Sequence, residues 1–194
     1  LNVSGAEAVA VQAGVTISGN AASQQGGGVM VTQGALTQTN VVYTGNFAFN
    51  YGGGLFAYGA VHLGNVVLAR NATMFDGGGI ARFSGSLRGI GVNLTDNTAA
   101  RNGAGMYSEG GSSAQLAGSQ FIRNAAQSDG GGMYVKSTSV TLDGATFISN
   151  TAGTTIGFGG GLVVTGTAPV TLTAGVFKDN VAYTAAQIGV DQLL

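Results

Sequence analysis

The sequence predicts an all-β protein: a right-handed parallel β-helix of about seven coils, with about 26 residues and three short strands in each coil. Two repeated markers and one hydrophobic pattern support this prediction. The markers are a glycine triplet and an asparagine, and both recur at the same period. Between them, apolar and polar residues alternate over short stretches, which indicates β-strands.

Glycine-rich triplets recur along the chain, and one apolar residue follows each of them. The last residues of successive triplets are 26, 25, 26, 27 and 29 positions apart. The triplets occupy residues 26–28, 52–54, 77–79, 103–105, 130–132 and 159–161, with Ala104 at the centre of the fourth. We expect each triplet to form a tight corner, where a positive φ or a close backbone approach excludes a Cβ atom.

An asparagine recurs three residues after an apolar residue, with spacings of 26, 25, 26, 27, 26 and 30. These asparagines are Asn20, Asn46, Asn71, Asn97, Asn124, Asn150 and Asn180. Parallel coils stack about 4.8 Å apart, so that each residue lies on its counterpart in the next coil. We therefore expect the asparagines to point inward and form a hydrogen-bonded ladder. Phe121, Phe147 and Phe177 are expected to stack inside the coils in the same way.

The strands are predicted from alternating segments such as residues 61–63, 140–142 and 170–172. No stretch shows a sustained helical period, the leucine-rich repeat consensus is absent, and the repeat is too short for a propeller blade. The crossover rule for parallel strands predicts right-handed winding. We expect one domain over residues 1–194, as a segment of a longer chain. Extra residues between Asn150 and Gly159 predict an outward loop around Gly153, Thr154 and Thr155.

Composition excludes several classes of protein. Glycine accounts for 36 of 194 residues, yet there is one proline and no glycine period of three, which excludes collagen. The absence of cysteine excludes a disulfide scaffold. Seven basic residues against eight acidic ones argue against a nucleic-acid partner. No apolar run reaches the ~18 residues of a membrane span. Hydrophobic residues make up 44%, enough to bury a core.

The two markers together resemble a known family. Phe-x-x-Asn, as in 121–124 and 147–150, combined with Gly-Gly-x-apolar, as in 130–133, resembles the repeats of chlamydial polymorphic outer-membrane proteins. More broadly, it resembles the pectin-lyase-like superfamily of right-handed β-helices. The family motif usually has alanine as its third residue, where this chain has glycine. The resemblance covers nearly the whole chain. It implies an exported β-helical passenger that is often adhesive, and hence an extracellular or cell-surface location.

Folds of this superfamily also carry polysaccharide lyases and hydrolases, which need carboxylates for Ca²⁺ binding or acid–base catalysis. Asp76, Asn102 and Asp129 precede glycine triplets in three successive coils and are the candidate cation ligands. The alternative interpretation is turn chemistry, because Asp and Asn are common at corners before glycine. His62 has no nucleophile pattern around it, and the common catalytic motifs are absent. We therefore expect no catalytic residues and no cofactor.

Two further columns are predicted to lie on the surface. Arg70, Asp96 and Arg123 precede successive ladder asparagines, alternate in charge, and are expected to form a salt-bridge ladder. The second residue after each triplet should point outward, opposite the buried residue before it. This column contains Met30, Phe56, Ala81, Tyr107, Tyr134 and Val163. It predicts an exposed apolar stripe that serves as an interface. The alternative is that a corner covers these residues against a loop.

The sequence thus predicts a non-enzymatic structural and adhesive module at the cell surface or outside the cell. Its expected partners are further copies of itself or a cell-surface or glycan ligand. One alternative is a filament subunit that stacks end to end. Another is a pectate-lyase-like, polysaccharide-active enzyme that uses Asp76 and Asp129. An ice-binding face is a further alternative, but it would need a regular column of outward threonines, which only Thr141 and Thr171 provide.

Overall fold

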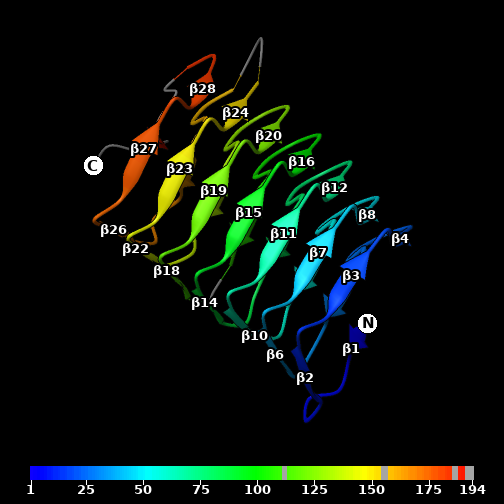
Figure 1. Cartoon of the computed structure of the whole chain (residues 1–194). Helices are drawn as coiled ribbons and strands as arrows, with labels where there is room; N and C mark the ends of the chain where they lie inside the picture. The colour runs from blue at the N-terminus through cyan, green and yellow to red at the C-terminus, as the bar shows by residue number, and fades with distance from the viewer. Residues whose placement is uncertain (111–112, 154–156, 185–187, 191–194) are drawn as a thin grey trace.

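The computed structural model describes residues 1–110, 113–153, 157–184 and 188–190. Within these ranges every regular element is a β-strand, and the chain winds as a solenoid with its first and last coils at opposite ends (Figure 1). Each strand pairs in parallel with its counterparts in the neighbouring coils, which produces four sheets, named A to D here. The predicted all-β solenoid of about seven coils is confirmed.

The strands of each sheet follow one another in chain order. Sheet A contains β1 (Asn2–Val3), β5 (Val29–Val31), β9 (Leu55–Ala57), β13 (Ile80–Arg82), β17 (Met106–Glu109), β21 (Met133–Lys136), β25 (Leu162–Thr165) and β29 (Ile188–Val190). Sheet B contains β2 (Val9–Ala13), β6 (Ala35–Thr39), β10 (Ala60–Gly64), β14 (Leu87–Ile90), β18 (Ala114–Ala117), β22 (Val140–Asp143) and β26 (Val170–Thr173).

Sheets C and D lie on either side of the ladder asparagine. Sheet C contains β3 (Thr16–Ser18), β7 (Val42–Thr44), β11 (Val67–Ala69), β15 (Asn93–Thr95), β19 (Gln120–Ile122), β23 (Thr146–Ile148) and β27 (Val176–Lys178). Sheet D contains β4 (Ala21–Ala22), β8 (Phe47–Ala48), β12 (Ala72–Thr73), β16 (Thr98–Ala99), β20 (Ala125–Ala126), β24 (Thr151–Ala152) and β28 (Val181–Ala182).

Sheet D contributes a fourth strand to each coil, whereas the sequence predicted three strands per coil. Its strands have two residues each, and from β8 to β24 each residue pairs with the coil before and the coil after, as Ala72 does with Phe47 and Thr98. Two residues are too few for an alternating pattern to be recognised in the sequence. The loop predicted around Gly153, Thr154 and Thr155 falls mainly outside the described residues.

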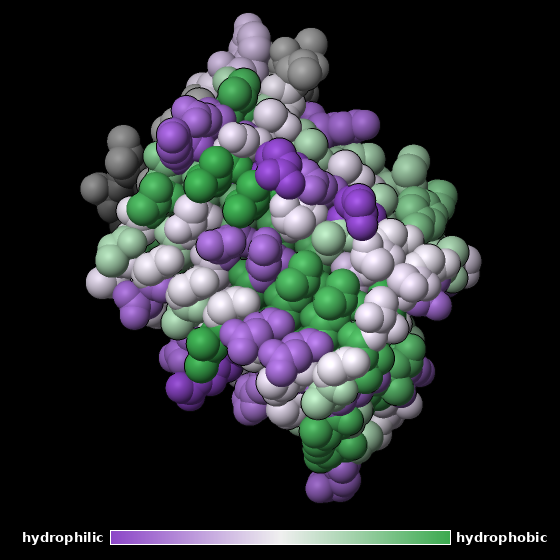
Figure 2. Space-filling model, in the orientation of Figure 1, coloured by the Kyte–Doolittle hydropathy of each residue, from purple (hydrophilic) through white to green (hydrophobic). Residues whose placement is uncertain are grey.

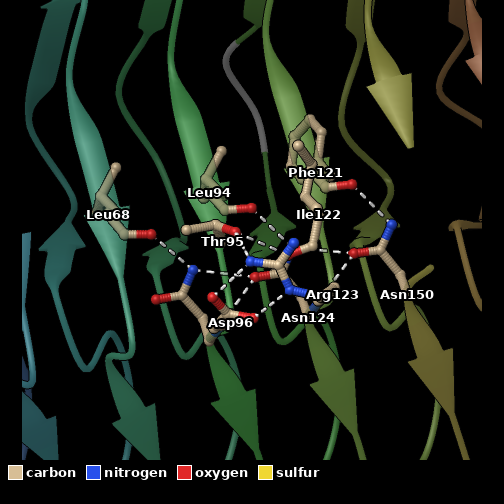
Figure 3. A network of polar contacts seen from close by, with 10 residues as sticks. Leu68, Leu94, Thr95, Asp96, Phe121, Ile122, Arg123, Asn124 and Asn150 are labelled. Carbon is tan, nitrogen blue, oxygen red and sulfur yellow. Dashed lines mark hydrogen bonds and ion pairs between the residues drawn. The ribbon is translucent and has the colours of Figure 1, made fainter. Parts of the chain in front are cut away.

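The asparagine ladder is confirmed (Figure 3). The side-chain oxygen of Asn124 accepts hydrogen bonds from the backbone N and from Nδ2 of Asn97, at 3.1 and 3.0 Å. Nδ2 of Asn124 also donates to the carbonyl of Leu94 at 2.9 Å. This pattern repeats from coil to coil, and the ladder residues are buried apart from Asn20 in the first coil. The ladder therefore joins each coil to both neighbours through polar groups that water does not reach.

The residue before each ladder asparagine has a positive φ of 51° to 65°. The column contains Gly19, Gly45, Arg70, Asp96, Arg123, Ser149 and Asp179. Its predicted charge ladder forms only in part: Arg123 binds both carboxylate oxygens of Asp96, at 2.7 and 2.8 Å, whereas Arg70 lies 3.4 Å from Oγ1 of Thr44. Both arginines lean toward the preceding coil. In the coil before Arg70 this column holds Gly45, which offers no carboxylate.

The glycine triplets form tight corners, as predicted. The first residue of every triplet has a φ between 55° and 73°. The second approaches the backbone of the next coil, and a Cβ on Gly53 would lie 2.4 Å from the carbonyl oxygen of Ala72. In the fourth triplet Ala104 takes the second place and is buried in a small cluster with Ala99 and Ala126. The apolar residue after each triplet points into the core.

The core consists of inward columns that run along the solenoid. The rings of Phe121, Phe147 and Phe177 stack almost in parallel, with centroids 4.5 and 4.6 Å apart, which confirms the predicted aromatic stack. The outer face of sheet C, by contrast, mixes polar and apolar side chains (Figure 2). The interior is thus ordered by column, whereas the outer face of sheet C has no such uniform composition.

Candidate functional site

The predicted outward column of sheet A is aligned as the repeat requires. Met30, Phe56, Ala81, Tyr107, Tyr134 and Val163 pair in register from β5 to β25. The expectation of an exposed stripe is wrong for most of the column, because Phe56, Tyr107 and Val163 are buried, while Met30 and Tyr134 are half-buried. The column does leave the core, but other side chains cover it. The alternative interpretation, in which these residues are covered by other parts of the chain, therefore describes this column.

Aromatic rings from outside the column provide much of the cover. Tyr51 and Phe75 come from the loop before the triplet, and Tyr58 and Phe83 follow the strands of sheet A. Ring centroids 4.9 to 6.5 Å apart join eight residues into one cluster. We call it the aromatic surface, and it contains Phe49, Tyr51, Phe56, Tyr58, Phe75, Phe83, Tyr107 and Tyr134. Phe83 lies between Phe56 and Tyr107, above the place where the column has only Ala81.

The rim of the aromatic surface remains open to solvent. Phe49 is 49% exposed and Tyr58 is 43% exposed, whereas Phe56, whose ring contacts that of Tyr58, is completely buried. Met74, next to Phe75, is also exposed. Buried rings thus hold exposed rings in place, which gives a packed apolar platform rather than a set of isolated side chains.

The other end of this surface carries a charged network. Tyr107 donates its hydroxyl hydrogen to Oε2 of Glu109 at 2.7 Å, and Nζ of Lys136 lies 2.7 Å from Oε1 of the same carboxylate. Burial raises the pKa of Glu109, but the hydrogen bonds from Lys136 and Tyr107 outweigh it and lower the pKa overall. Burial raises the pKa of Tyr107, and the bonded carboxylate raises it further. The tyrosine is therefore a hydrogen-bond donor and no candidate base.

The candidate cation ligands make backbone contacts. Oδ1 of Asp76 accepts a hydrogen bond from the backbone N–H of Asn102 at 2.9 Å, and Oδ1 of Asn102 accepts one from the backbone N–H of Asp129 at 3.2 Å. Oδ1 of Asp129 in turn accepts one from the backbone N–H of Phe158 at 2.9 Å. This is the turn chemistry of the alternative interpretation. Asp76 is buried, its Oδ2 lies 3.8 Å from Arg101, and burial raises its pKa. Within the described ranges, no group of three or more His, Asp or Glu side chains is arranged to hold a metal ion.

Sequence reasoning missed Arg82, which points into the core at the end of β13. Its neighbours in the inward column are Ala57 and Ser108, whose small side chains leave room for the guanidinium. The guanidinium donates to Oγ of Ser108 at 3.0 Å and to the carbonyl of Gly85. Burial lowers the pKa of Arg82 to about 10. Strand alternation was the available signal, since Arg82 lies two residues after the inward Ile80.

Four parallel sheets wound into one solenoid define the class of protein. The family model of the right-handed beta helix region matches residues 2–173, and the chain belongs to this family. The right-handed winding predicted from the crossover rule is thereby confirmed. No curated protein and no solved structure matches the chain. The finer resemblance to chlamydial outer-membrane proteins stays a prediction. In the described part of the chain, no helix is long and apolar enough to cross a membrane.

Proposed function

We propose that this chain is a non-enzymatic structural and adhesive module that acts at a cell surface or outside the cell. The observation that carries the proposal is the aromatic surface, a platform of eight contacting rings fixed to a continuous solenoid. Membership of the right-handed beta helix family accounts for the fold but does not specify a function. We therefore argue the function from the aromatic surface.

Rigidity supports the structural part of the proposal. Every ladder asparagine from Asn46 to Asn150 bonds both neighbouring coils, and the inward apolar side chains of successive coils pack into one core. A platform attached to such a scaffold loses little conformational entropy when a partner binds. Binding energy is then available for the contact itself.

The composition of the platform supports the adhesive part. Aromatic residues and methionine are enriched at protein interfaces, and contiguous exposed apolar groups are uncommon on a monomer surface without a role. Phe49, Tyr58 and Met74 are each exposed at this surface, and the Glu109–Lys136 pair supplies polar groups at its other end. The arrangement thus combines exposed apolar groups with one charged pair, as protein interfaces do.

The lyase-like alternative receives less support from the same geometry. Asp76 and Asp129, the carboxylates on which it depends, each use one oxygen for a backbone amide of the next coil. Asp76 is moreover buried beside Arg101. These contacts hold the corner together, and we therefore favour a non-enzymatic role.

Bead retention under flow tests the proposal. Beads that carry the covalently attached chain are placed on films of cellulose, chitin and collagen and on cell monolayers, and the flow that removes half of them is measured. We expect at least one surface to retain wild-type beads. The double variant Phe49→Ser/Tyr58→Ser should lower retention there by about tenfold or more, because exposed rings at a platform's rim contribute much of the contact.

A matched variant controls for the loss of apolar area. Val176 and Val181 are 49% and 58% exposed on sheets C and D, so Val176→Ser/Val181→Ser removes similar groups from other faces. It should keep wild-type retention. Equal losses in both variants, or no retention on any surface, would contradict the adhesive proposal. Soluble sugar released from the polysaccharide films by wild type, but not by Asp76→Asn, would favour an enzyme instead.

A further inference from the structure

Two tyrosines lie in register on adjacent coils. Tyr107 on β17 pairs with Tyr134 on β21, and their rings stack with centroids 5.5 Å apart and planes inclined by 8°. All six tyrosines of the chain lie within the described ranges, and no other two of their rings contact each other. The parallel register therefore holds one pair of phenols face to face.

The surroundings of the two rings differ. Tyr107 is buried, its ring packs on that of Phe83 at 5.5 Å, and its hydroxyl donates to Oε2 of Glu109 at 2.7 Å. Tyr134 is half-buried, and its hydroxyl oxygen accepts a hydrogen bond from Oγ1 of Thr165 at 3.4 Å. A reagent in solution can thus meet Tyr134, while Tyr107 is held against it.

Oxidation can join two such phenols. Each ring loses one electron and its phenolic proton, and a carbon–carbon bond forms between the ring carbons next to the two oxygens. The hydrogens on these carbons then move to the oxygens, which restores both phenols. Two hydrogen atoms leave in total, and hydrogen peroxide takes them through a peroxidase to become two water molecules.

Glu109 gives the proton of Tyr107 a place to go. Because burial raises the pKa of Tyr107, its proton leaves together with the electron rather than before it. The carboxylate of Glu109 lies within hydrogen-bond distance to accept that proton, and its own pKa is lowered by Lys136 and Tyr107. The pair therefore combines a fixed stack with a proton acceptor.

We propose that Tyr107 and Tyr134 are a modification site, at which a peroxidase with hydrogen peroxide forms an intramolecular dityrosine cross-link. The bond joins β17 to β21, across residues that are 27 positions apart in the chain. The chain has no cysteine, so disulfides cannot join its coils. A dityrosine constrains the unfolded chain in the way that a disulfide does. This inference does not depend on the adhesive function.

Exposure by itself favours other tyrosines. Tyr58 is 43% exposed and Tyr183 is 69% exposed, and neither ring contacts another tyrosine within the described part of the chain. Oxidation of these two residues therefore joins separate molecules, which a low protein concentration suppresses. The cross-linked monomer then reports the stacked pair.

Tryptic mapping of the monomer after treatment with peroxidase and hydrogen peroxide tests the inference. Cleavage after Arg101, Arg123 and Lys136 places the two tyrosines in separate peptides, 102–123 and 124–136. We expect these peptides to be joined, with a mass lower by two hydrogen atoms and with dityrosine fluorescence. Tyr134→Phe should abolish the joined pair. Denaturing urea during the reaction should lower its yield about tenfold or more, because a free chain rarely brings the rings together.

Tyr58→Phe/Tyr183→Phe is the matched control, since it removes the two exposed phenols and keeps their rings. It should retain the wild-type yield of the joined peptides while covalent dimers decrease. The cross-linked monomer should also unfold at a higher urea concentration than the untreated one. An oxidised wild type without the joined peptides, an equal yield in urea, or loss of the joined peptides in the control variant would each overturn the proposal. An unchanged unfolding midpoint would contradict its stabilising role.

Discussion

Asn97 illustrates how a single side chain joins three coils. Its Oδ1 accepts from the backbone N and Nδ2 of Asn71, at 3.0 and 3.1 Å. Its Nδ2 donates to the carbonyl of Leu68 at 2.8 Å and to Oδ1 of Asn124 at 3.0 Å. The side chain is completely buried. A shorter residue at this place would leave buried groups of two coils without partners.

We therefore expect Asn97→Ala to lower the free energy of unfolding by at least about 3 kcal/mol, measured by urea denaturation. Asn20→Ala is the control, because Asn20 makes similar bonds to Asn46 but is exposed in the first coil. Water can replace its bonds, so the loss should be about 1 kcal/mol or less. Similar losses at the two positions would show that burial does not determine the strength of the ladder.

Asp76 and Asp96 have pKa values shifted in opposite directions. Burial raises the pKa of Asp76, while the hydrogen bond from Arg123 lowers that of Asp96. A raised carboxyl pKa means that the folded state binds the proton more tightly, so this contribution to stability grows as the pH falls through the folded pKa. A lowered pKa gives a contribution that is present above the unfolded pKa and is lost as the pH falls through the folded one.

Asp76→Asn should thus be at least as stable as wild type at neutral pH, and its advantage should shrink toward acid pH. The amide fits this column, since Asn102 makes the same bond one coil further on. Asp96→Asn should be slightly less stable at neutral pH, by a small amount because the Arg123 pair is exposed, and its deficit should shrink in acid. Calorimetric melting across the pH range measures both. An advantage of Asp76→Asn that grows in acid would contradict the assignment.

At the scale of the element, two kinds of corner turn the chain. Both have glycine or another residue at positive φ, but they differ in the space around it. Gly45 has a φ of 64°, and a Cβ added there would have no atom within 4 Å, so that Arg70 and Asp96 occupy the same place in later coils. Gly52 has a φ of 66°, and its Cβ would lie 2.4 Å from the carbonyl oxygen of Leu55.

Gly52→Ala should therefore destabilise the protein by about 3 kcal/mol, because backbone strain and a clash with the next strand add. Gly45→Ala has the strain alone and should cost about 1 kcal/mol. Denaturant unfolding of the two variants compares them directly. The interpretation fails if Gly45→Ala is the more harmful change. Equal losses in the two variants would instead show that strain, rather than space, selects glycine at the triplet.

At the scale of the whole molecule, each coil contacts only its neighbours, so stability is a sum of local terms. Central strands have a partner coil on both sides, whereas the side chains of β2 and β26 are largely half-buried or exposed. We expect amides of β11 and β15 to exchange with solvent at least about tenfold more slowly than those of β2 and β26. Hydrogen exchange measured by NMR checks this. Uniform rates would indicate that the solenoid opens as a single unit.

Much of the fold could be predicted from the sequence, because parallel stacking places equal repeat positions next to each other. The ladder residues, the Phe121–Phe147–Phe177 stack and the register of the Met30–Val163 column followed from spacing alone. Sheet D was missed because two residues show no period. The candidate site was predicted only in part. Its column was correct, but its exposure was not.

The sequence by itself determined which residues neighbour each other along the axis, because the markers recur about every 26 residues and equivalent residues of successive coils stack on each other. The tertiary structure alone decided which residues meet around the coil. Corner angles bring Tyr51 and Phe83 together 4.9 Å apart, although they belong to different positions of different repeats. They also turn Arg70 toward Thr44 and leave two shallow hollows beside Ile90 on the outer face of sheet B. Such lateral contacts depend on the path of each turn, and no repeat period encodes that path.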